Sequence, residues 1–101
     1  MEDYNLVVSP AAQDDLRYIV DHLNTLPAGE AIQQYEHIIG SIEHLSKMPE
    51  TYPIAKDLQL RLRGYRTLKA NDCMVFFIQS GKTVVIRRIL FTRRRYESLI
   101  G

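Results

Sequence analysis

The chain has 101 residues, 46% hydrophobic and 25% charged, as expected for one compact globular domain spanning residues 1–101. It contains no apolar run near the ~20 residues that a membrane-spanning helix needs. Its first residues do not form the basic and then apolar segment that directs secretion. Cys73 is the only cysteine, so no internal disulfide can form, and a reducing cytoplasm is the expected compartment.

The net charge of +1 conceals two halves of opposite charge. Residues 1–55 contain two basic and nine acidic side chains, a sum of −7. Residues 56–101 contain eleven basic and three acidic side chains, a sum of +8. Charge segregated in this way within one small domain favours a polyanion or an acidic partner on the basic side. A polarised but merely solvated surface is the plainer alternative.

The first half of the chain predicts a strand followed by two helices. Residues 4–9 are apolar and β-branched at their centre, as in a short strand. Ser9 and Pro10 predict a helix start, because serine caps free amides and proline fits the first helical position. Apolar residues at helical spacing extend this helix to residues 24–26 and predict a second one from residues 28–30 to 46–47. A short connection between them predicts an antiparallel hairpin.

The second half predicts three strands. Residues 58–63 alternate strictly between apolar and polar, which predicts a half-buried strand, and Gly64 predicts a bulge or turn before the strand continues over 65–69. Residues 74–78 are continuously apolar, as in a central strand covered on both faces, and a turn at 80–82 leads to a strand over 83–91. The expected fold is α+β, ordered β-α-α-β-β-β with or without a short helix over 93–100. The helix hairpin should pack on one face of a twisted antiparallel sheet that has the first strand at its edge.

Familiar enzyme signatures are missing from the sequence. It contains no glycine-rich phosphate loop, no cysteine or histidine pair at metal-ligand spacing and no GxSxG motif. No metal and no cofactor are therefore expected. His22, His37 and His44 fit surface positions, and Cys73 fits a small apolar residue better than a nucleophile.

Basic side chains on and after the strands are the candidate functional residues. Arg87 and Arg88 are neighbours in a strand, so they should point to opposite faces, one of them towards a groove or an acidic neighbour. Residues 93–95 are all arginine and Tyr96 follows them. Such a cluster can grip phosphates, stack on a base or stabilise charge on a scissile phosphate. The alternative is that these arginines begin a solvent-exposed helix and form salt bridges with the acidic helices.

Several short segments also occur in a recognisable order. They are Ser9-Pro10-Ala11-Ala12, Asp15-Leu16 with Ile19, Ile38, Ile42 and Leu45 with Pro49, Leu62-Arg63, Tyr65-Arg66-Thr67-Leu68, Val75-Phe76-Phe77-Ile78, and Val85 to Arg94. In this order and at these spacings they resemble the RelE/ParE superfamily, the toxins of type II toxin–antitoxin systems. The resemblance spans almost the whole chain. It implies a small toxin and a cognate antitoxin whose acidic or amphipathic C-terminal segment covers the basic groove.

The resemblance implies one of two activities. RelE-like members cut mRNA in the ribosomal A site without a metal, using basic side chains and often a tyrosine. ParE-like members bind and poison DNA gyrase. Carried over by position, the catalytic candidates are Arg66, Lys69, Arg94 and Tyr96. The candidates for binding RNA or the antitoxin are Arg61, Arg63, Arg88, Arg93 and Arg95.

The sequence departs from the RelE pattern in two places. Cys73-Met74 stands where many members have Tyr-Arg, and Phe91 stands where many have histidine, so a phosphate contact and a proton carrier are lost. The long helix hairpin also resembles ParE more than the most compact RelE proteins. The prediction is a toxin, with ribosome-dependent mRNA endoribonuclease as the leading activity and the ribosome and mRNA as partners. The alternatives are a ParE-like gyrase poison and a non-toxic basic module that binds nucleic acid.

Overall fold

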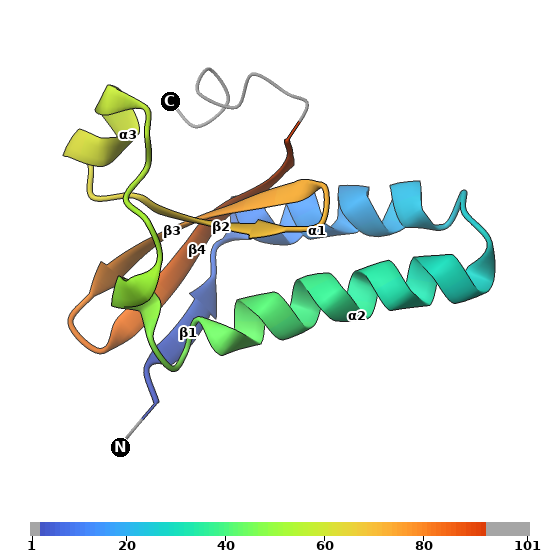
Figure 1. Ribbon diagram of the computed structural model, residues 1–101, viewed down its shortest axis with the longest axis horizontal. Coiled ribbons are helices and arrows are strands. Elements are labelled where there is room, and N and C mark those ends of the chain that lie inside the picture. The colour runs from blue at the N-terminus through green and yellow to red at the C-terminus, as the bar shows by residue number, and fades with distance from the viewer. Residues whose placement is uncertain (1–2, 93–101) are drawn as a thin grey trace.

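The computed structural model describes residues 3–92 and shows a strand, a helix hairpin and a sheet (Figure 1). The predicted C-terminal helix and the candidates Arg93, Arg94, Arg95 and Tyr96 lie outside these described residues. No helix within 3–92 combines the length and the apolar character that crossing a membrane requires. The elements are, in order, β1 (Asn5–Val8), α1 (Pro10–Leu23), α2 (Ala28–His44), a short 3₁₀ helix (Pro49–Thr51), α3 (Leu58–Leu62), β2 (Arg66–Ala70), β3 (Cys73–Ser80) and β4 (Thr83–Phe91).

The sheet has the strand order β1-β4-β3-β2. The strands β2, β3 and β4 pair antiparallel through short turns, and β1 lies at the edge beside β4. The α+β fold with the first strand at the edge is thereby confirmed. β1 pairs parallel to β4, from Asn5 opposite Thr83 to Val8 opposite Ile86, so the sheet is mixed. A parallel pair needs a long connection, and here the rest of the domain provides it.

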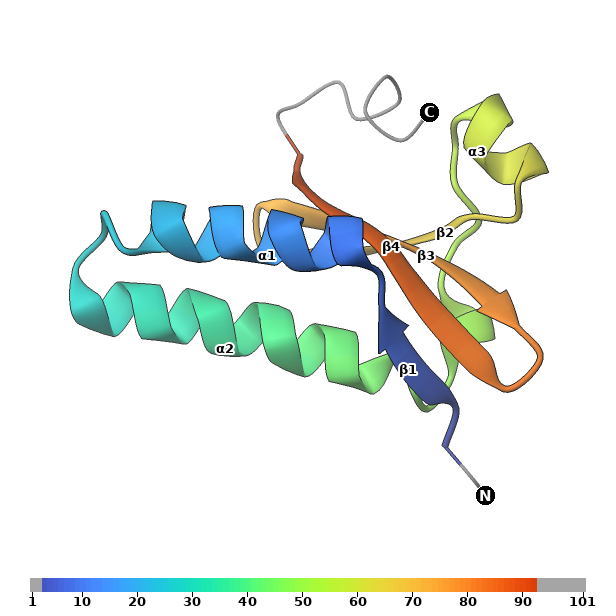
Figure 2. The same cartoon turned by 180° about the vertical axis from the view of Figure 1, so that it is seen from behind.

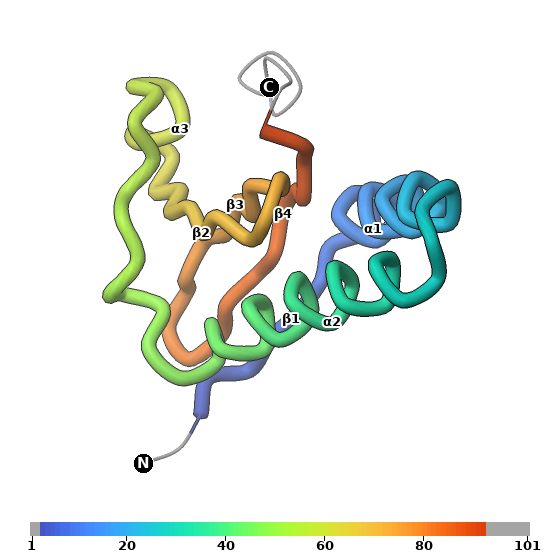
Figure 3. The backbone as a smooth tube through the Cα atoms, turned by 45° about the vertical axis from the view of Figure 1, so that its right-hand side comes forward, coloured from blue at the N-terminus to red at the C-terminus, as the bar shows by residue number. Residues whose placement is uncertain are grey.

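The helix hairpin covers one face of the sheet (Figures 2 and 3). The predicted start of α1 is confirmed, because the Ser9 hydroxyl accepts a hydrogen bond from the Ala12 amide (3.3 Å) and Pro10 opens the helix. The apolar stripes of both helices pack on the inner residues of the sheet. The buried members of this main core include Ile19, Leu23, Ile38, Ile42, Val75, Phe77, Val84 and Ile86.

The strand predicted over residues 58–63 is wrong, because this segment forms the helix α3. The Asp57 carboxylate caps it by accepting a hydrogen bond from the Leu60 amide (3.1 Å), and Gly64, at φ +84°, makes the turn into β2. Leu60 is buried, whereas Leu58 and Leu62 are exposed. The alternation of leucines therefore did not mark a buried strand face. A local cap and a left-handed glycine decided the conformation instead.

The segment that contains α3 lies over the other face of the sheet. Leu60 and Tyr65 form a second, smaller core with Phe76 of β3 and Leu90 of β4. Phe77 belongs to the main core, so β3 is covered on both faces, as its continuous apolar sequence predicted. Cys73 is buried, and this burial, together with Asp72, raises the pKa of its thiol to about 11. The interpretation of Cys73 as an apolar residue is confirmed.

Candidate functional site

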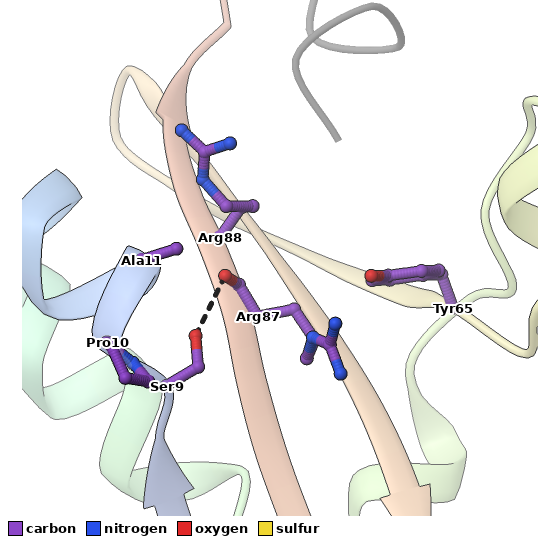
Figure 4. A pocket seen from close by; sticks show the side chains of 6 residues that line it. All are labelled: Ser9, Pro10, Ala11, Tyr65, Arg87 and Arg88. Carbon is purple, nitrogen blue, oxygen red and sulfur yellow. Dashed lines mark hydrogen bonds between the residues drawn. The ribbon is translucent and has the colours of Figure 1, made fainter. Parts of the chain in front are cut away.

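A pocket of about 420 Å³ opens where the start of α1 meets β4 (Figure 4). Tyr65, which follows the turn after α3, closes it from the other side. The lining residues are Ser9, Pro10, Ala11, Tyr65, Arg87 and Arg88. The pocket thus combines two guanidinium groups, a phenol and the first turn of a helix.

A β-bulge brings both arginines to this pocket. Phe77 pairs with Ile86, but its neighbour Phe76 pairs with Arg88, so Arg87 is an extra residue in β4. An extra residue breaks the regular alternation of side chains and bends the strand. The prediction that Arg87 and Arg88 point to opposite faces is therefore wrong, because both line one pocket.

Arg88 meets the acidic neighbour that the sequence predicted for one of this pair. Its Nε and Nη2 donate to the two carboxylate oxygens of Asp15 at 2.6 and 2.9 Å, and the Ile89 amide donates to the same carboxylate at 3.0 Å. The hydrogen bond with Asp15 raises the pKa of Arg88 above its ordinary value. This bidentate pair joins α1 to β4 and neutralises one of the two charges at the pocket.

Ser9 fixes the start of α1 against the bulge. Its amide donates to the carbonyl of Ile86 at 2.9 Å, and its hydroxyl donates to the carbonyl of Arg87 at 3.0 Å. The same hydroxyl accepts from Ala12 as the helix cap. One residue therefore sets the position of the helix relative to the two arginines.

The two catalytic candidates of β2 do not meet. Arg66 donates through Nη1 to the carbonyl of Tyr52 at 2.6 Å, on the side of the sheet where Leu68 joins the main core. Lys69 is exposed and pairs with Met74, which belongs to the second core. Because side chains three residues apart in a regular strand point to opposite faces, Arg66 and Lys69 lie on different faces of the sheet.

The candidates around α3 are separated as well. The Nε and Nη2 of Arg61 donate to the carbonyls of Ala55 and Lys56 at 3.3 and 3.1 Å, which fastens the loop before α3. Arg63 caps the end of α3 and is exposed. Neither residue lines the pocket beside Arg87.

The two departures from the RelE pattern serve packing. Met74 packs against the second core and lines a hollow of about 320 Å³ together with Leu60 and Phe76. Phe91 packs edge-on against Tyr18 and His22, with ring centroids 6.1 and 5.1 Å apart. Within residues 3–92, no group of three histidine, cysteine or acidic side chains is placed to hold a metal ion.

The sequence did not point to Ser9 or Tyr65 as site residues, and it indicated Arg87 only as one of two strand arginines, either of which could face a groove. An arginine pair in the middle of an otherwise apolar strand was the available signal, since two charges there fit a bulge better than regular pairing. No sequence pattern indicated that Tyr65 would line the pocket, because its position depends on the preceding helix α3, which the sequence did not predict.

Comparison with known proteins identifies relatives of this fold. The family model described as the ParE toxin of the type II toxin–antitoxin system parDE matches residues 6–96. A chromosomal ParDE system from P. aeruginosa has a similar structure, with a TM-score of 0.72 and 22% identity over 87% of this chain and 95% of that chain. The RelBE2 toxin–antitoxin complex from Mycobacterium tuberculosis is similar with a TM-score of 0.59 and 18% identity, over 90% and 93% of the two chains.

Among curated protein sequences, none is significantly similar to this chain. The structural neighbours show a shared fold at low identity, and the family match confirms the RelE/ParE resemblance of the sequence. The family match covers nearly the whole sequence. The chain therefore belongs to the ParE toxin family of type II toxin–antitoxin systems.

Proposed function

We propose that this toxin acts by binding DNA gyrase, the target of ParE-like members, and that it does not cut mRNA. The separation of Arg66 and Lys69 on opposite faces of β2 is the observation that carries the proposal. Within the described residues, the candidates for a nuclease centre either hold the fold together or lie on different faces. The family match points the same way.

A metal-free nuclease of the RelE kind needs several cationic groups around one phosphate, with a proton carrier beside them. Here Arg66 is engaged by a backbone carbonyl and Arg88 by Asp15. Met74, which packs against the second core, stands at the position where many relatives have an arginine. These contacts support a toxin that works through binding.

The exposed surface of α3 supports a protein target. Leu58 and Leu62 lie one helical turn apart and are both exposed, and Ile54 is exposed nearby in the chain. Basic residues flank them, among them Lys56 and Arg63. A small apolar patch with a charged rim is typical of protein–protein interfaces.

The basic half of the chain supports an acidic inhibitor. An antitoxin segment rich in carboxylates would neutralise the +8 charge of residues 56–101. The two structural neighbours come from toxin–antitoxin systems. We therefore include a cognate antitoxin with an acidic or amphipathic segment in the proposal.

An mRNA endoribonuclease is the second candidate, because the cluster Arg93–Arg95 and Tyr96 retains the residue types that bind RNA. One experiment separates the two activities. The chain is expressed under control in a bacterial host while the synthesis of DNA and of protein is followed by pulse labelling. We expect DNA synthesis to fall first, and the purified toxin to inhibit supercoiling by gyrase.

An early fall of protein synthesis with cleavage of translated mRNA would overturn the gyrase proposal. In that case Arg94→Ala should abolish cleavage. A gyrase poison should cut no mRNA, with or without this substitution. Unchanged growth in cells that contain soluble protein would favour the third alternative, a basic module without toxicity. A graded, salt-dependent affinity for nucleic acid would then be the expected property.

A further inference from the structure

The Tyr65 side chain packs its ring in an apolar core and lines the pocket with its hydroxyl end. The residue is only 4% exposed, and its ring packs with Leu60, Phe76 and Leu90 in the second core. Its hydroxyl points across the pocket towards the two arginines (Figure 4). Within residues 3–92, no side chain or backbone group makes a hydrogen bond with this hydroxyl. Since no side-chain oxygen of the described residues is both buried and without a hydrogen-bond partner, the hydroxyl is accessible at the pocket and can donate to a ligand there.

Arg87 supplies the uncompensated charge of the same pocket. Its side chain is exposed, and no acidic group among the described residues pairs with it. The charge of Arg88 is already balanced by the carboxylate of Asp15. Counted over the described residues that line it, the pocket therefore holds one net positive charge, which suits a ligand with a single negative charge.

The first turn of α1 adds a backbone hydrogen-bond donor to the pocket. Amides in the first turn of a helix have no acceptor within the helix, and the helix dipole favours an anion there. Pro10 has no N–H and the Ala12 amide already donates to Ser9. Ala11 is among the residues that line the pocket, so its amide is the first-turn donor that remains for a ligand.

The remaining walls are apolar. They consist of the proline ring of Pro10, the methyl group of Ala11 and the aromatic ring of Tyr65. With a volume of about 420 Å³, the pocket has room for the methylene groups of a side chain as well as for its charged end. A glutamate side chain combines such a stem with a planar, singly charged carboxylate, which matches a guanidinium and a phenol.

We propose that this pocket binds a carboxylate side chain of the antitoxin, with Arg87, Tyr65 and the Ala11 amide as donors. The proposal rests on the antitoxin partner put forward under the proposed function and adds the contact by which the antitoxin is recognised. The Arg87 guanidinium and the Tyr65 hydroxyl donate to the two carboxylate oxygens. The stem of the side chain lies against Pro10 and the Tyr65 ring.

The test uses isotope-labelled full-length protein and a small probe, N-acetylglutamate amide, followed by NMR. We expect a saturable shift of the Arg87 Nε–H and Ala11 amide signals. N-acetylglutamine amide, which has the same shape without the charge, should not produce it. Tyr65→Phe removes only the hydroxyl and should weaken binding about tenfold, the usual effect of a lost hydrogen bond to a charged group.

Arg87→Ala should abolish the shift of the Ala11 signal, and Lys82→Ala, which removes an equal charge from the turn before β4, should preserve it. The remaining signals of each variant show that it is folded. The proposal is overturned if the neutral probe binds equally well, if no probe binds, or if Tyr65→Phe has no effect. Tighter binding of dimethyl phosphate than of the carboxylate would assign the pocket to the nucleic-acid backbone instead.

The outcome is independent of the activity of the toxin. The NMR measurement does not require growth inhibition, so the carboxylate site can fail while gyrase remains the target. A chain without toxicity can likewise retain the pocket. The two proposals are therefore decided by separate observations.

Discussion

The two faces of the sheet are built for different purposes. The face under the helix hairpin is closed by a continuous apolar core that includes Phe77, Val75 and Ile86, all fully buried. The opposite face carries a smaller core around Phe76 and Leu60 and is flanked by two hollows. Stability is thus concentrated on one side, which leaves the other free to carry exposed apolar and basic side chains.

The largest expected effect comes from emptying the closed face. Phe77→Ala should lower the free energy of unfolding by about 3–5 kcal/mol, because it leaves a cavity in a packed core. Leu62→Ala on α3 should change it by less than about 0.5 kcal/mol, since Leu62 is 78% exposed. Denaturation by urea measures both. Equal losses would show that the two faces contribute alike to stability.

The ion pair between Asp15 of α1 and Arg88 of β4 should make the next largest contribution to the free energy of unfolding. Asp15→Asn removes the carboxylate that holds Arg88 and the Ile89 amide, and should cost about 2–3 kcal/mol, because a partly buried cation loses its partner. The matched control is Asp14→Asn. Its partner Arg17 forms an ion pair that is 73% exposed on both sides, and such pairs contribute little. A similar loss in both variants would contradict a structural role for Asp15.

A smaller effect is expected at the start of α1. Ser9→Ala should cost about 1 kcal/mol through loss of the helix cap and should also release the carbonyl of Arg87. Thermal unfolding measures the loss. Ser80→Ala, at an exposed strand end, serves as the control and should be close to neutral. A Ser9 variant as stable as the control would show that the bulge, and not the serine, positions α1.

The smallest effect concerns Cys73 in the native state. Its thiol has a pKa of about 11 in the fold, against 9.0 for an ordinary thiol, so it should react slowly with thiol reagents at neutral pH. The raised pKa means that folding favours the protonated thiol. This contribution to stability is fully present below pH 9 and is lost as the pH rises through about 11. Rapid labelling of native protein at neutral pH would contradict this placement.

The sequence predicted those parts of the fold that depend on local rules. The cap at Ser9, the helix stripes and the apolar β3 each follow from spacing and residue type, and each is confirmed. Alternation over residues 58–63 failed, because Asp57 and Gly64 determine α3 from outside the pattern. The site was harder to predict. Whether Arg66 and Lys69 meet depends on strand faces, and whether Arg87 and Arg88 meet depends on a bulge that spacing does not reveal.

The bulge in β4 makes Arg87 an extra residue that the pairing of β3 with β4 does not need. Phe77 faces Ile86 and Phe76 faces Arg88, so a chain that lacked Arg87 could keep both pairings and every pairing beyond them. Arg87 is thus the residue of β4 that the ladder of hydrogen bonds can do without. A position that is dispensable for pairing, yet anchored through its carbonyl to Ser9, is free to change its side chain as partners change.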